Sequence, residues 1–437
     1  MPEADHARAA MLAEARALAL PLNTSADLDP LVDRVGESRL VCLGEASHGT
    51  HEFYQWRARA SARLIVDKGF TWIGVEGDWP DCWRINEWVR GRADTDLDSR
   101  QLLAGFGRWP TWMWANEEVA DFLTWLREHN AHVAAEHQVG FYGLDVYSLW
   151  DSLRAINAWL EVHAPEALPA ARQAWQCFLP YAEDPHHYAW STRLVPEQCE
   201  TDVIELLGAV RAHASFTGPD DDAFNAVVNA EVAAAAEHYY RTMVRGDRES
   251  WNVRDRHMAA TVDRVAQHHG PESRGLVWEH NTHVGDARAT DMASAGMVNV
   301  GQLLRERRAS GEVLLVGFAT HHGSVLASDG WGERQRVMTV PHASPGSHED
   351  LVHEALNDSA LLLFGGDREG PWLSAWKGHR AIGVVYRPDR ELGNYVPTRM
   401  GGRYDALVWC AETTALQPLH PEGRPLEPEL ETEPSGM

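Results

Sequence analysis

The sequence predicts an α/β fold in which a mostly parallel central sheet is flanked by helices. Short apolar runs recur along the 437 residues, and each run ends at a polar or charged side chain. Such runs are typical of strands that are covered on both faces of a parallel sheet. Helical patterns separate the runs, as expected for β-α-β units. The predicted strands are residues 40–44, 72–75, 139–144, 276–278, 313–319, 382–386 and 407–410.

One linking helix is predicted at residues 51–68. Gly69 follows it, and glycine favours the end of a helix. Arg57 lies at the margin of the buried face rather than on the solvent side. The apolar face consists of Phe53, Trp56, Ala60 and Leu64.

The segment at about 151–268 differs from the rest, because alanine is dense in it and β-branched runs are scarce. We expect a helical insertion that covers an active-site cleft. Within it, residues 220–268 form one or two long helices broken near Gly246. Residues 1–416 are then one α/β domain with this insertion. The tail, residues 417–437, is rich in proline and glutamate and is expected to be disordered.

Charge and hydropathy limit the partners of this chain. Its 39 basic and 64 acidic residues give a formal net charge of −25, which disfavours binding to nucleic acid and to anionic membranes. We find no run of about 18 apolar residues that could cross a membrane. Charged residues interrupt positions 1–18, so no signal peptide is expected. The oligomeric state is left open.

The cysteines are odd in number and widely spaced. No two are close enough to suggest a zinc site or a redox pair, so we expect reduced thiols and a cytoplasmic protein. The five are Cys42, Cys82, Cys177, Cys199 and Cys410.

Acids and histidines gather at the predicted ends of the strands, beyond which an open parallel sheet binds its ligands. Several strand ends that supply such groups together indicate an active site. These ends carry Glu45, His48, Glu76, Asp78, Asp145, His280, His283 and His321. The residues expected to contact a substrate are Asp78, Asp145, Asp286 and His321.

The segment Gly44–Thr50 puts Glu45 and His48 in a turn from a strand to a helix. Histidine suits proton transfer near neutral pH, and a neighbouring carboxylate can fix its tautomer. The alternative is structural: Glu45 or Ser47 caps the helix and His48 packs in the turn.

Two further segments carry similar alternatives. Glu76 directly follows a strand, where desolvation tends to raise a carboxyl pKa, so it is either a base, a group that orients water or a helix cap. His280 and His283 are three residues apart and face one site if the segment coils; each alone would be a surface residue.

Other chemistries have weaker support. The residues His48, Glu76, His280 and His283 would suit a divalent ion, but the chain has no His-Glu-x-x-His motif. We therefore expect a metal-independent site without a cofactor. The chain also lacks a Gly-x-Ser-x-Gly elbow and the glycine-rich phosphate loops, which argues against the usual serine hydrolase and against nucleotide binding.

With these residues in view, the chain resembles the erythromycin esterase family. The resemblance covers about residues 30–415 and rests on four segments in order: residues 44–49, Arg57, residues 75–78 and residues 280–283. It implies an α/β fold whose helical insertion forms a deep cleft. It also implies a hydrolase, the best-known members of which open macrolide lactones.

The resemblance implies roles for the site residues. His48 matches the general base that activates water, and Glu45 matches the acid beside it. Glu76 matches a carboxylate that orients or shares the proton. Three further residues match groups of the cleft: Arg57, His280 and His283.

The sequence thus predicts cleavage of an ester or lactone by water that His48 activates, with Arg57 or protonated His283 stabilising the oxyanion. The substrate is a small molecule, such as a macrolide or another natural product. Two alternatives stay open: a hydrolase that depends on a divalent metal, and a non-hydrolytic binding protein or enzyme that uses the same cleft.

Overall fold

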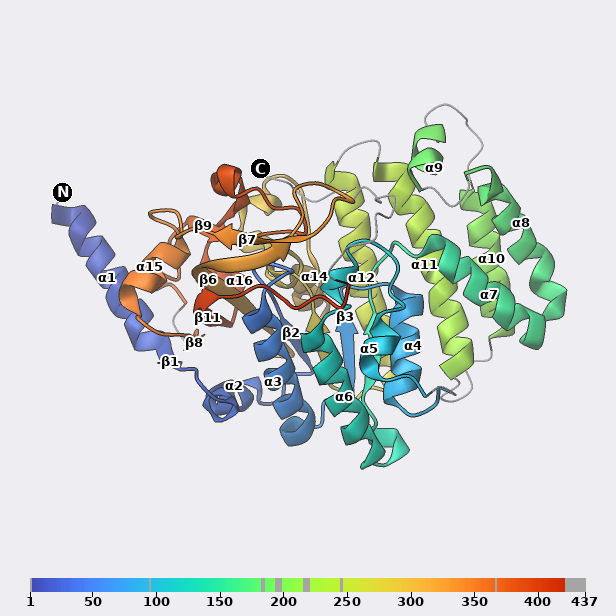
Figure 1. The fold of residues 1–437 in the computed structure, drawn as a ribbon, viewed down its shortest axis with the longest axis horizontal. Coiled ribbons are helices and arrows are strands. Elements are labelled where there is room, and N and C mark those ends of the chain that lie inside the picture. The colour runs from blue at the N-terminus through green and yellow to red at the C-terminus, as the bar shows by residue number, and fades with distance from the viewer. Residues whose placement is uncertain are drawn as a thin grey trace.

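The computed structural model of the chain describes residues 2–93, 96–181, 185–192, 199–214, 221–243, 247–365 and 368–420. Within these residues the structure is an α/β fold with a sheet between helical layers and a helical bundle at one end (Figure 1). The predicted fold class is confirmed.

The central sheet is mostly parallel. Its order is β1-β8-β11-β6-β2-β5-β3-β4, and β7 pairs with β6. All pairings from β11 to β4 are parallel, whereas β1, β7 and β8 pair antiparallel. The strands are β1 Ala19–Pro21, β2 Leu40–Leu43, β3 Trp72–Val75, β4 Gly140–Gly143, β5 Gly275–Trp278, β6 Val313–Ala327, β7 Arg336–Val340, β8 Ala360–Leu363 and β11 Ala406–Thr413. A separate hairpin pairs β9 Lys377–Arg380 with β10 Tyr395–Thr398.

One predicted strand is wrong. Residues 382–386 make isolated bridges, Ser47 to Ile382 and Ser328 to Val385, and no regular strand. Ile382 and Tyr386 are nevertheless buried in a small apolar cluster. Burial alone therefore produced the apolar run that the sequence analysis interpreted as a strand.

Helices cover both faces of the sheet because its side chains alternate between two apolar cores. Val41 and Leu43 of β2 pack in the core that includes α2, α3 and α6. Leu40 and Cys42 pack in the core that includes α1, α14, α15 and α12 (Asp247–His269). The helices outside the bundle are α1 Pro2–Leu18, α2 Asp29–Val35, α3 His51–Lys68, α4 Trp79–Val89, α5 Ser99–Leu103, α6 Glu117–Ala131, α13 Asn281–Val284, α14 Val300–Arg307, α15 His348–Ala355 and α16 Met400–Arg403.

The predicted helix over residues 51–68 is present as α3. Gly69 ends it in the left-handed conformation, with φ of 68°, which glycine adopts without a steric penalty.

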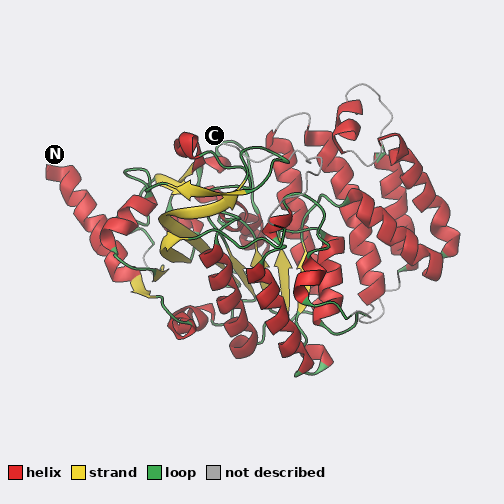
Figure 2. Ribbon diagram, viewed as in Figure 1, coloured by secondary structure: helices red, strands yellow, loops and turns green. Residues whose placement is uncertain are grey.

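The chain between β4 and β5 forms a bundle of helices with a core of its own, far from α1 (Figure 2). Its helices are α7 Leu149–His163, α8 Leu168–Phe178, α9 Pro185–Ser191, α10 Glu200–His213, α11 Asp221–Met243 and α12 Asp247–His269. The expected break near Gly246 falls on residues 244–246, which lie outside the described residues. The last helix, α12, also packs against the sheet through Met258 and Val262.

Two expectations about the chain need adjustment. Cys177 on α8 and Cys199 before α10 form a disulfide, so the expectation of reduced thiols is wrong for this pair, and the argument for a reducing compartment loses its basis. Backbone hydrogen bonds extend the packing beyond residue 416: the N–H of Glu117 at the start of α6 donates to Gln417 O, and Leu419 N–H donates to Ala115 O. Residues 421–437 lie outside the described residues. Among the helices of the described residues, none combines the length and the apolar character that a membrane span requires.

Candidate active site

The loop Gly44–Thr50 carries the first pair of site residues from β2 to α3. Two glycines let it pass close to neighbouring backbone. A Cβ on Gly44 would lie 2.2 Å from the Asn281 side chain, and one on Gly49 would lie 1.8 Å from the carbonyl oxygen of Leu326. The loop is therefore fixed between β6 and the segment after β5, and larger residues would displace it.

His48 and Glu45 of this loop form a buried pair. The two atoms His48 Nδ1 and Glu45 Oε1 are 2.8 Å apart. With Nδ1–H donating to the carboxylate, Nε2 becomes the basic nitrogen of the ring. Arg57 lies on the other side of Glu45, with 2.8 Å between Nη2 and Oε2 in an ion pair that lacks hydrogen-bond angles. Its guanidinium is also stacked near the rings of Tyr54 and Trp278.

Glu76 follows β3 and is held by a guanidinium. Arg254 Nη2 donates to Glu76 Oε1 at 2.7 Å and to Asp145 Oδ2 at 2.8 Å, while its Nε donates to Asp145 Oδ1 at 3.0 Å. The backbone N–H of His280 donates to Glu76 Oε2 at 2.8 Å. One buried cation of the helical bundle thus binds the carboxylates after β3 and β4.

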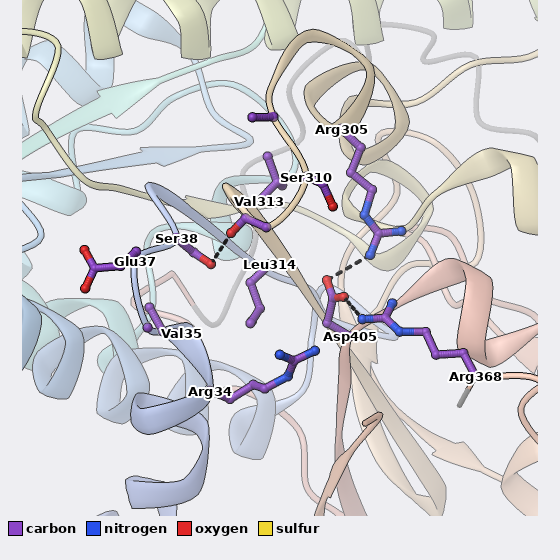
Figure 3. A pocket seen from close by; sticks show the side chains of 13 residues that line it. Arg34, Val35, Glu37, Ser38, Arg305, Ser310, Val313, Leu314, Arg368 and Asp405 are labelled. Carbon is purple, nitrogen blue, oxygen red and sulfur yellow. Dashed lines mark hydrogen bonds and ion pairs between the residues drawn. The ribbon is translucent and has the colours of Figure 1, made fainter. Parts of the chain in front are cut away.

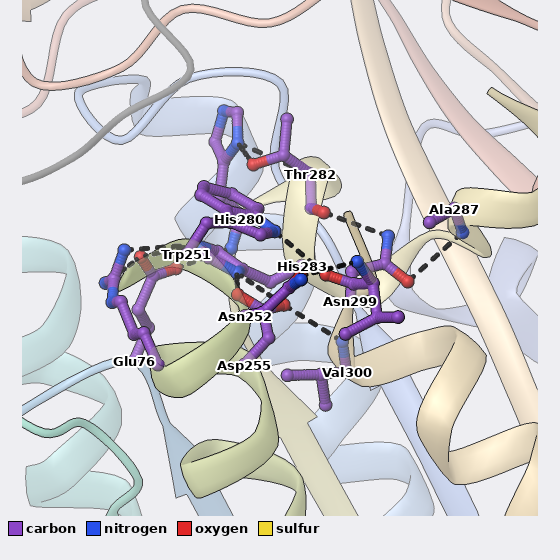
Figure 4. Close-up of polar contacts among 12 residues, drawn as sticks. Glu76, Trp251, Asn252, Asp255, His280, Thr282, His283, Ala287, Asn299 and Val300 are labelled. Carbon is purple, nitrogen blue, oxygen red and sulfur yellow. Dashed lines mark hydrogen bonds and ion pairs between the residues drawn. The ribbon is translucent and has the colours of Figure 1, made fainter. Parts of the chain in front are cut away.

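His283 lies between Glu76 and Asp255, and Asp255 belongs to α12 (Figure 4). Its Nδ1 is 3.0 Å from both carboxylate oxygens of Asp255, and its Nε2 is 3.4 Å from Glu76 Oε1 and 3.2 Å from Arg254 Nη1. The ring stacks on Trp251, with 4.5 Å between centroids. Burial alone would lower the pKa of His283, but the charges of Asp255 and Glu76 raise it above its ordinary value.

The same charges act on Glu76. Burial would raise the pKa of its carboxyl, but the positive charges of His283, Arg254 and His48 lower it to about 2. Sequence reasoning expected desolvation to raise this pKa, and that expectation is wrong because the neighbouring cations outweigh burial. Glu76 is an ionised carboxylate at neutral pH.

His280 lies beside His48, with 4.7 Å between the ring centroids. Its Nδ1 accepts a hydrogen bond from the backbone N–H of Thr282 at 3.3 Å. Burial and the neighbouring His48 and His283 lower the pKa of His280 well below its usual value. A neutral imidazole therefore packs against His48.

A narrow pocket opens onto His48. Its polar wall consists of His48, Glu76, Asp78, Asp81, Asp145, Arg108 and Arg254, and its apolar wall includes Phe106, Met113 and Trp114. Its enclosed volume is only about 20 Å³, which is room for one or two water molecules. Together with the solvent at its mouth the space measures about 460 Å³.

The acids at the mouth of this pocket are only partly paired. Arg108 Nε donates to Asp78 Oδ2 at 2.5 Å, whereas Asp78 Oδ1 has no hydrogen-bond partner among the described residues. Burial raises the pKa of Asp78, and burial together with Asp78 raises the pKa of Asp81 to about 6.

The structure does not place all of the predicted site residues in the pocket. His48, Glu76, Asp78 and Asp145 line it, whereas the side chains of Glu45, Arg57, His280 and His283 lie behind these lining residues.

Two predicted substrate contacts lie elsewhere. Asp286 forms ion pairs with Arg288 and Arg305. His321 lies in the middle of β6 against other histidines, and burial together with the nearest of these, His353, lowers its pKa to about 4.

A larger pocket lies at the opposite edge of the sheet (Figure 3). It is lined by Leu314 at the start of β6 and by Asp405 before β11, which pairs with Arg305 and Arg368. Its enclosed volume is about 620 Å³, compared with about 20 Å³ for the pocket at His48. It contains none of the acid and histidine pairs described above. It also lies at the amino ends of the strands, whereas parallel sheets bind their ligands at the carboxyl ends.

Comparison with known families decides the relationship. Residues 65–413 match the family described as erythromycin esterase. The chain belongs to the erythromycin esterase family. The matched range begins after Glu45, His48 and Arg57, so their assignment rests on the geometry and on the sequence motif.

Individual relatives agree with this membership. The chain is 32% identical to an erythromycin esterase type II of Escherichia coli over 120 residues, which are 28% of this chain and 26% of that protein. It is 21% identical to YbfO of Bacillus subtilis strain 168 over 402 residues, 86% of this chain and 84% of that protein. Family and relatives indicate an enzyme of the esterase hydrolase class.

Solved structures share the fold. A protein of Bacillus cereus has a TM-score of 0.79 at 21% identity, and the match covers 94% of this chain and 98% of that one. A structure described as a succinoglycan biosynthesis protein has a TM-score of 0.75 at 19% identity, with the same coverage. An erythromycin esterase mutant in its open conformation has a TM-score of 0.65 at 18% identity, covering 90% of this chain and 95% of that one.

In this member of the erythromycin esterase family, sequence reasoning missed the residues that α12 supplies. Trp251, Arg254 and Asp255 lie in the stretch 247–256, whose many charges are typical of a solvated helix face. Arg254 and Asp255 are 3% and 0% exposed. One feature of the sequence could have indicated them. Several acids follow the predicted strands without basic residues beside them, and buried carboxylates need a cation from elsewhere in the chain.

Proposed function

We propose that the chain hydrolyses an ester or lactone by direct attack of a water molecule that His48 activates. The observation that carries the proposal is the buried His48–Glu45 pair at the wall of the pocket. The carboxylate fixes the ring with Nε2 as the base and stabilises the imidazolium that forms when the water loses its proton. Arg57 acts through Glu45, since it contacts that carboxylate and not the pocket.

Arg254 and Glu76 also line the pocket. We assign the stabilisation of the developing oxyanion to Arg254, a pocket-lining cation held in place by Glu76 and Asp145. This assignment replaces Arg57 and protonated His283, the two alternatives that the sequence analysis gave for that role. His283 lies next to Glu76, with 3.4 Å between its Nε2 and Glu76 Oε1, and the charges of Asp255 and Glu76 raise its pKa. Pre-positioned charges of this kind need no rearrangement when the oxyanion forms.

The substrate enters only if the pocket widens, because its present space fits one or two water molecules. The helical bundle is the candidate cover, since its last helix carries Arg254. We propose that residues 151–268 move as a cover over the carboxyl edge of the sheet. Hydrogen exchange should slow in α12 when a substrate analogue binds; exchange that is uniformly slow and unaffected by the analogue would rule out this motion.

The substrate class is a small-molecule ester or lactone, and macrolides are the first to test because of the name of the Escherichia coli relative. The purified chain should be assayed against macrolides, simple lactones and aryl esters, before and after dialysis against a strong chelator. Turnover that survives chelation supports the metal-independent mechanism. Turnover that is lost and then restored by zinc or manganese would favour the metal-dependent alternative.

The decisive variant is His48→Gln. We expect its kcat to fall by about 10²–10⁴ in a chain that still folds. His51→Gln is the matched control. His51 lies three residues after His48 and also pairs with a glutamate, with 2.6 Å between His51 Nδ1 and Glu118 Oε1. Unlike His48, it does not line the pocket. Near-normal turnover of the His48 variant would rule out the general base, and a chain that binds but does not hydrolyse any ester would indicate a binding protein.

A further inference from the structure

The larger pocket, at the amino ends of the parallel strands, is lined by three arginines (Figure 3). Arg34 comes from α2, Arg305 from α14 and Arg368 from the segment after β8. The volume of about 620 Å³ falls within the range of small-molecule sites, which is about 300–1,000 Å³. We call this space the arginine pocket. None of its described lining residues lines the pocket at His48.

Two acids line the arginine pocket, and one of them pairs with its cations. Asp405 lies 2.8 Å from Arg305 Nη2 and 2.5 Å from Arg368 Nη2. The other acid, Glu37, pairs instead with Arg274 at 3.0 Å, and its side chain is 99% exposed. Because Arg274 does not line the pocket, the charge of Glu37 is directed away from it. Three guanidinium groups therefore share the single carboxylate of Asp405.

Arg34 is the cation without an acidic partner. It lies in the last turn of α2 and is exposed, and within the described part of the chain its guanidinium forms no ion pair or hydrogen bond. Its side chain extends toward the region that Arg305 and Arg368 also approach (Figure 3). Arg305 has a second acid, Asp286, at 3.2 Å, but Asp286 also pairs with Arg288. The arginine pocket therefore has an excess of positive charge, in a chain whose formal net charge is −25.

We propose that the arginine pocket binds a small molecule through an oxyanion, either a phosphate or a carboxylate group. A guanidinium presents N–H donors in a plane that matches two oxygens of such a group. Arg34 supplies donors that the described part of the protein does not use, while Asp405 holds the other two arginines in place before the ligand arrives. Ser310 adds a hydroxyl to the lining, and Leu314 adds apolar surface for the carbon part of the ligand.

Calorimetric titration of the full chain with inorganic phosphate, and separately with succinate, tests the proposal at low ionic strength. We expect one anion per chain and an affinity that falls by about tenfold or more in Arg34→Met, because a hydrogen bond between charged groups is lost. The variant should fold, since Arg34 is exposed. Tighter binding of phosphate would indicate a phosphate ester as the ligand, and tighter binding of succinate would indicate a dicarboxylate. Added salt should weaken both.

Arg59→Met is the matched control. Arg59 on α3 also has no ion pair among the described residues; its guanidinium lies 4.8 Å from the ring centroid of Trp56, and it does not line the arginine pocket. Anion affinity should be unchanged in this variant.

Two outcomes concern the role of Arg34. The last turn of a helix favours a cation; if that were its only role, Arg34→Met would bind anions as tightly as the wild type, and the proposal would be overturned. An equal loss of affinity in Arg34→Met and Arg59→Met, or no binding of either anion by the wild type, would overturn it as well. The test measures binding alone, so its result does not depend on whether the chain hydrolyses an ester.

Discussion

Replacing Arg254 by methionine tests whether one guanidinium neutralises two buried carboxylates. Arg254, Glu76 and Asp145 are 3%, 3% and 1% exposed, and their nitrogen–oxygen contacts are 2.7–3.0 Å. Methionine preserves much of the side-chain volume but leaves both acids without their shared cation. Breaking a buried ion pair by removing one partner costs about 3–5 kcal/mol. We expect the free energy of unfolding at pH 7.5 to fall by about that amount.

The pH dependence of this loss distinguishes charge from packing. In the wild type His283 and Arg254 outweigh burial and lower the pKa of Glu76 to about 2, and Arg254 outweighs burial and lowers the pKa of Asp145. Without the guanidinium both pKa values rise, so the acids bind protons at a higher pH and become neutral. The difference in stability between wild type and variant should therefore be largest above pH 7 and should shrink as the pH falls towards 5.

Urea denaturation of both proteins at pH 7.5 and pH 5 measures the difference. Arg100→Met is the control, since Arg100 also contacts two carboxylates, Glu117 and Asp121, at 2.6 and 2.9 Å but is 48% exposed. We expect the control to lose less than about 1 kcal/mol. A loss of similar size in both variants, or a loss in Arg254→Met that does not change with pH, would refute the reasoning.

Two further predictions follow from the same site. Glu45→Gln should lower kcat by about 10–100-fold through weaker orientation of His48, whereas Glu118→Gln should leave kcat unchanged; equal kcat values for the two would contradict the role of Glu45. Because the folded pKa of Glu76 is about 2, its contribution of about 3 kcal/mol is present above pH 4.5 and is lost as the pH falls towards 2. Urea denaturation from pH 5 to 2.5 should show a steeper loss in the wild type than in Glu76→Gln, and parallel curves would contradict the low pKa.

The parallel strands could be predicted because burial on both faces leaves a continuous apolar run in the sequence. Val313–Ala319 gave such a run, but Thr320, His321 and His322 interrupted it, so the sequence predicted less than half of β6. Residues 382–386 show the reverse error, since buried loop residues are as apolar as strand residues. Periodicity records burial and does not record hydrogen-bond partners.

The candidate site could be predicted only where it follows the strands. Glu45, His48 and Glu76 come directly after β2 and β3, so strand-end reasoning located them. Arg254 and Asp255 belong to a charged helix, and only the tertiary fold shows that their partners are buried groups, Asp145 for Arg254 and His283 for Asp255. The disulfide between Cys177 and Cys199 was unpredictable for the same reason, because the packing of helices in the bundle brings the two thiols together.

The position of β2 has a consequence for how the chain folds. This strand lies between β5 and β6, so residue 40 pairs with residues 275 and 313. The central strands therefore cannot pair until the chain has been synthesised beyond β6. Contacts of such long sequence separation slow folding. A ribosome-bound chain that ends before β5 exposes the apolar faces of β2 on both sides. Nascent chains of that length should be targets for chaperones, and truncation from the carboxyl end should give aggregates rather than a smaller folded unit.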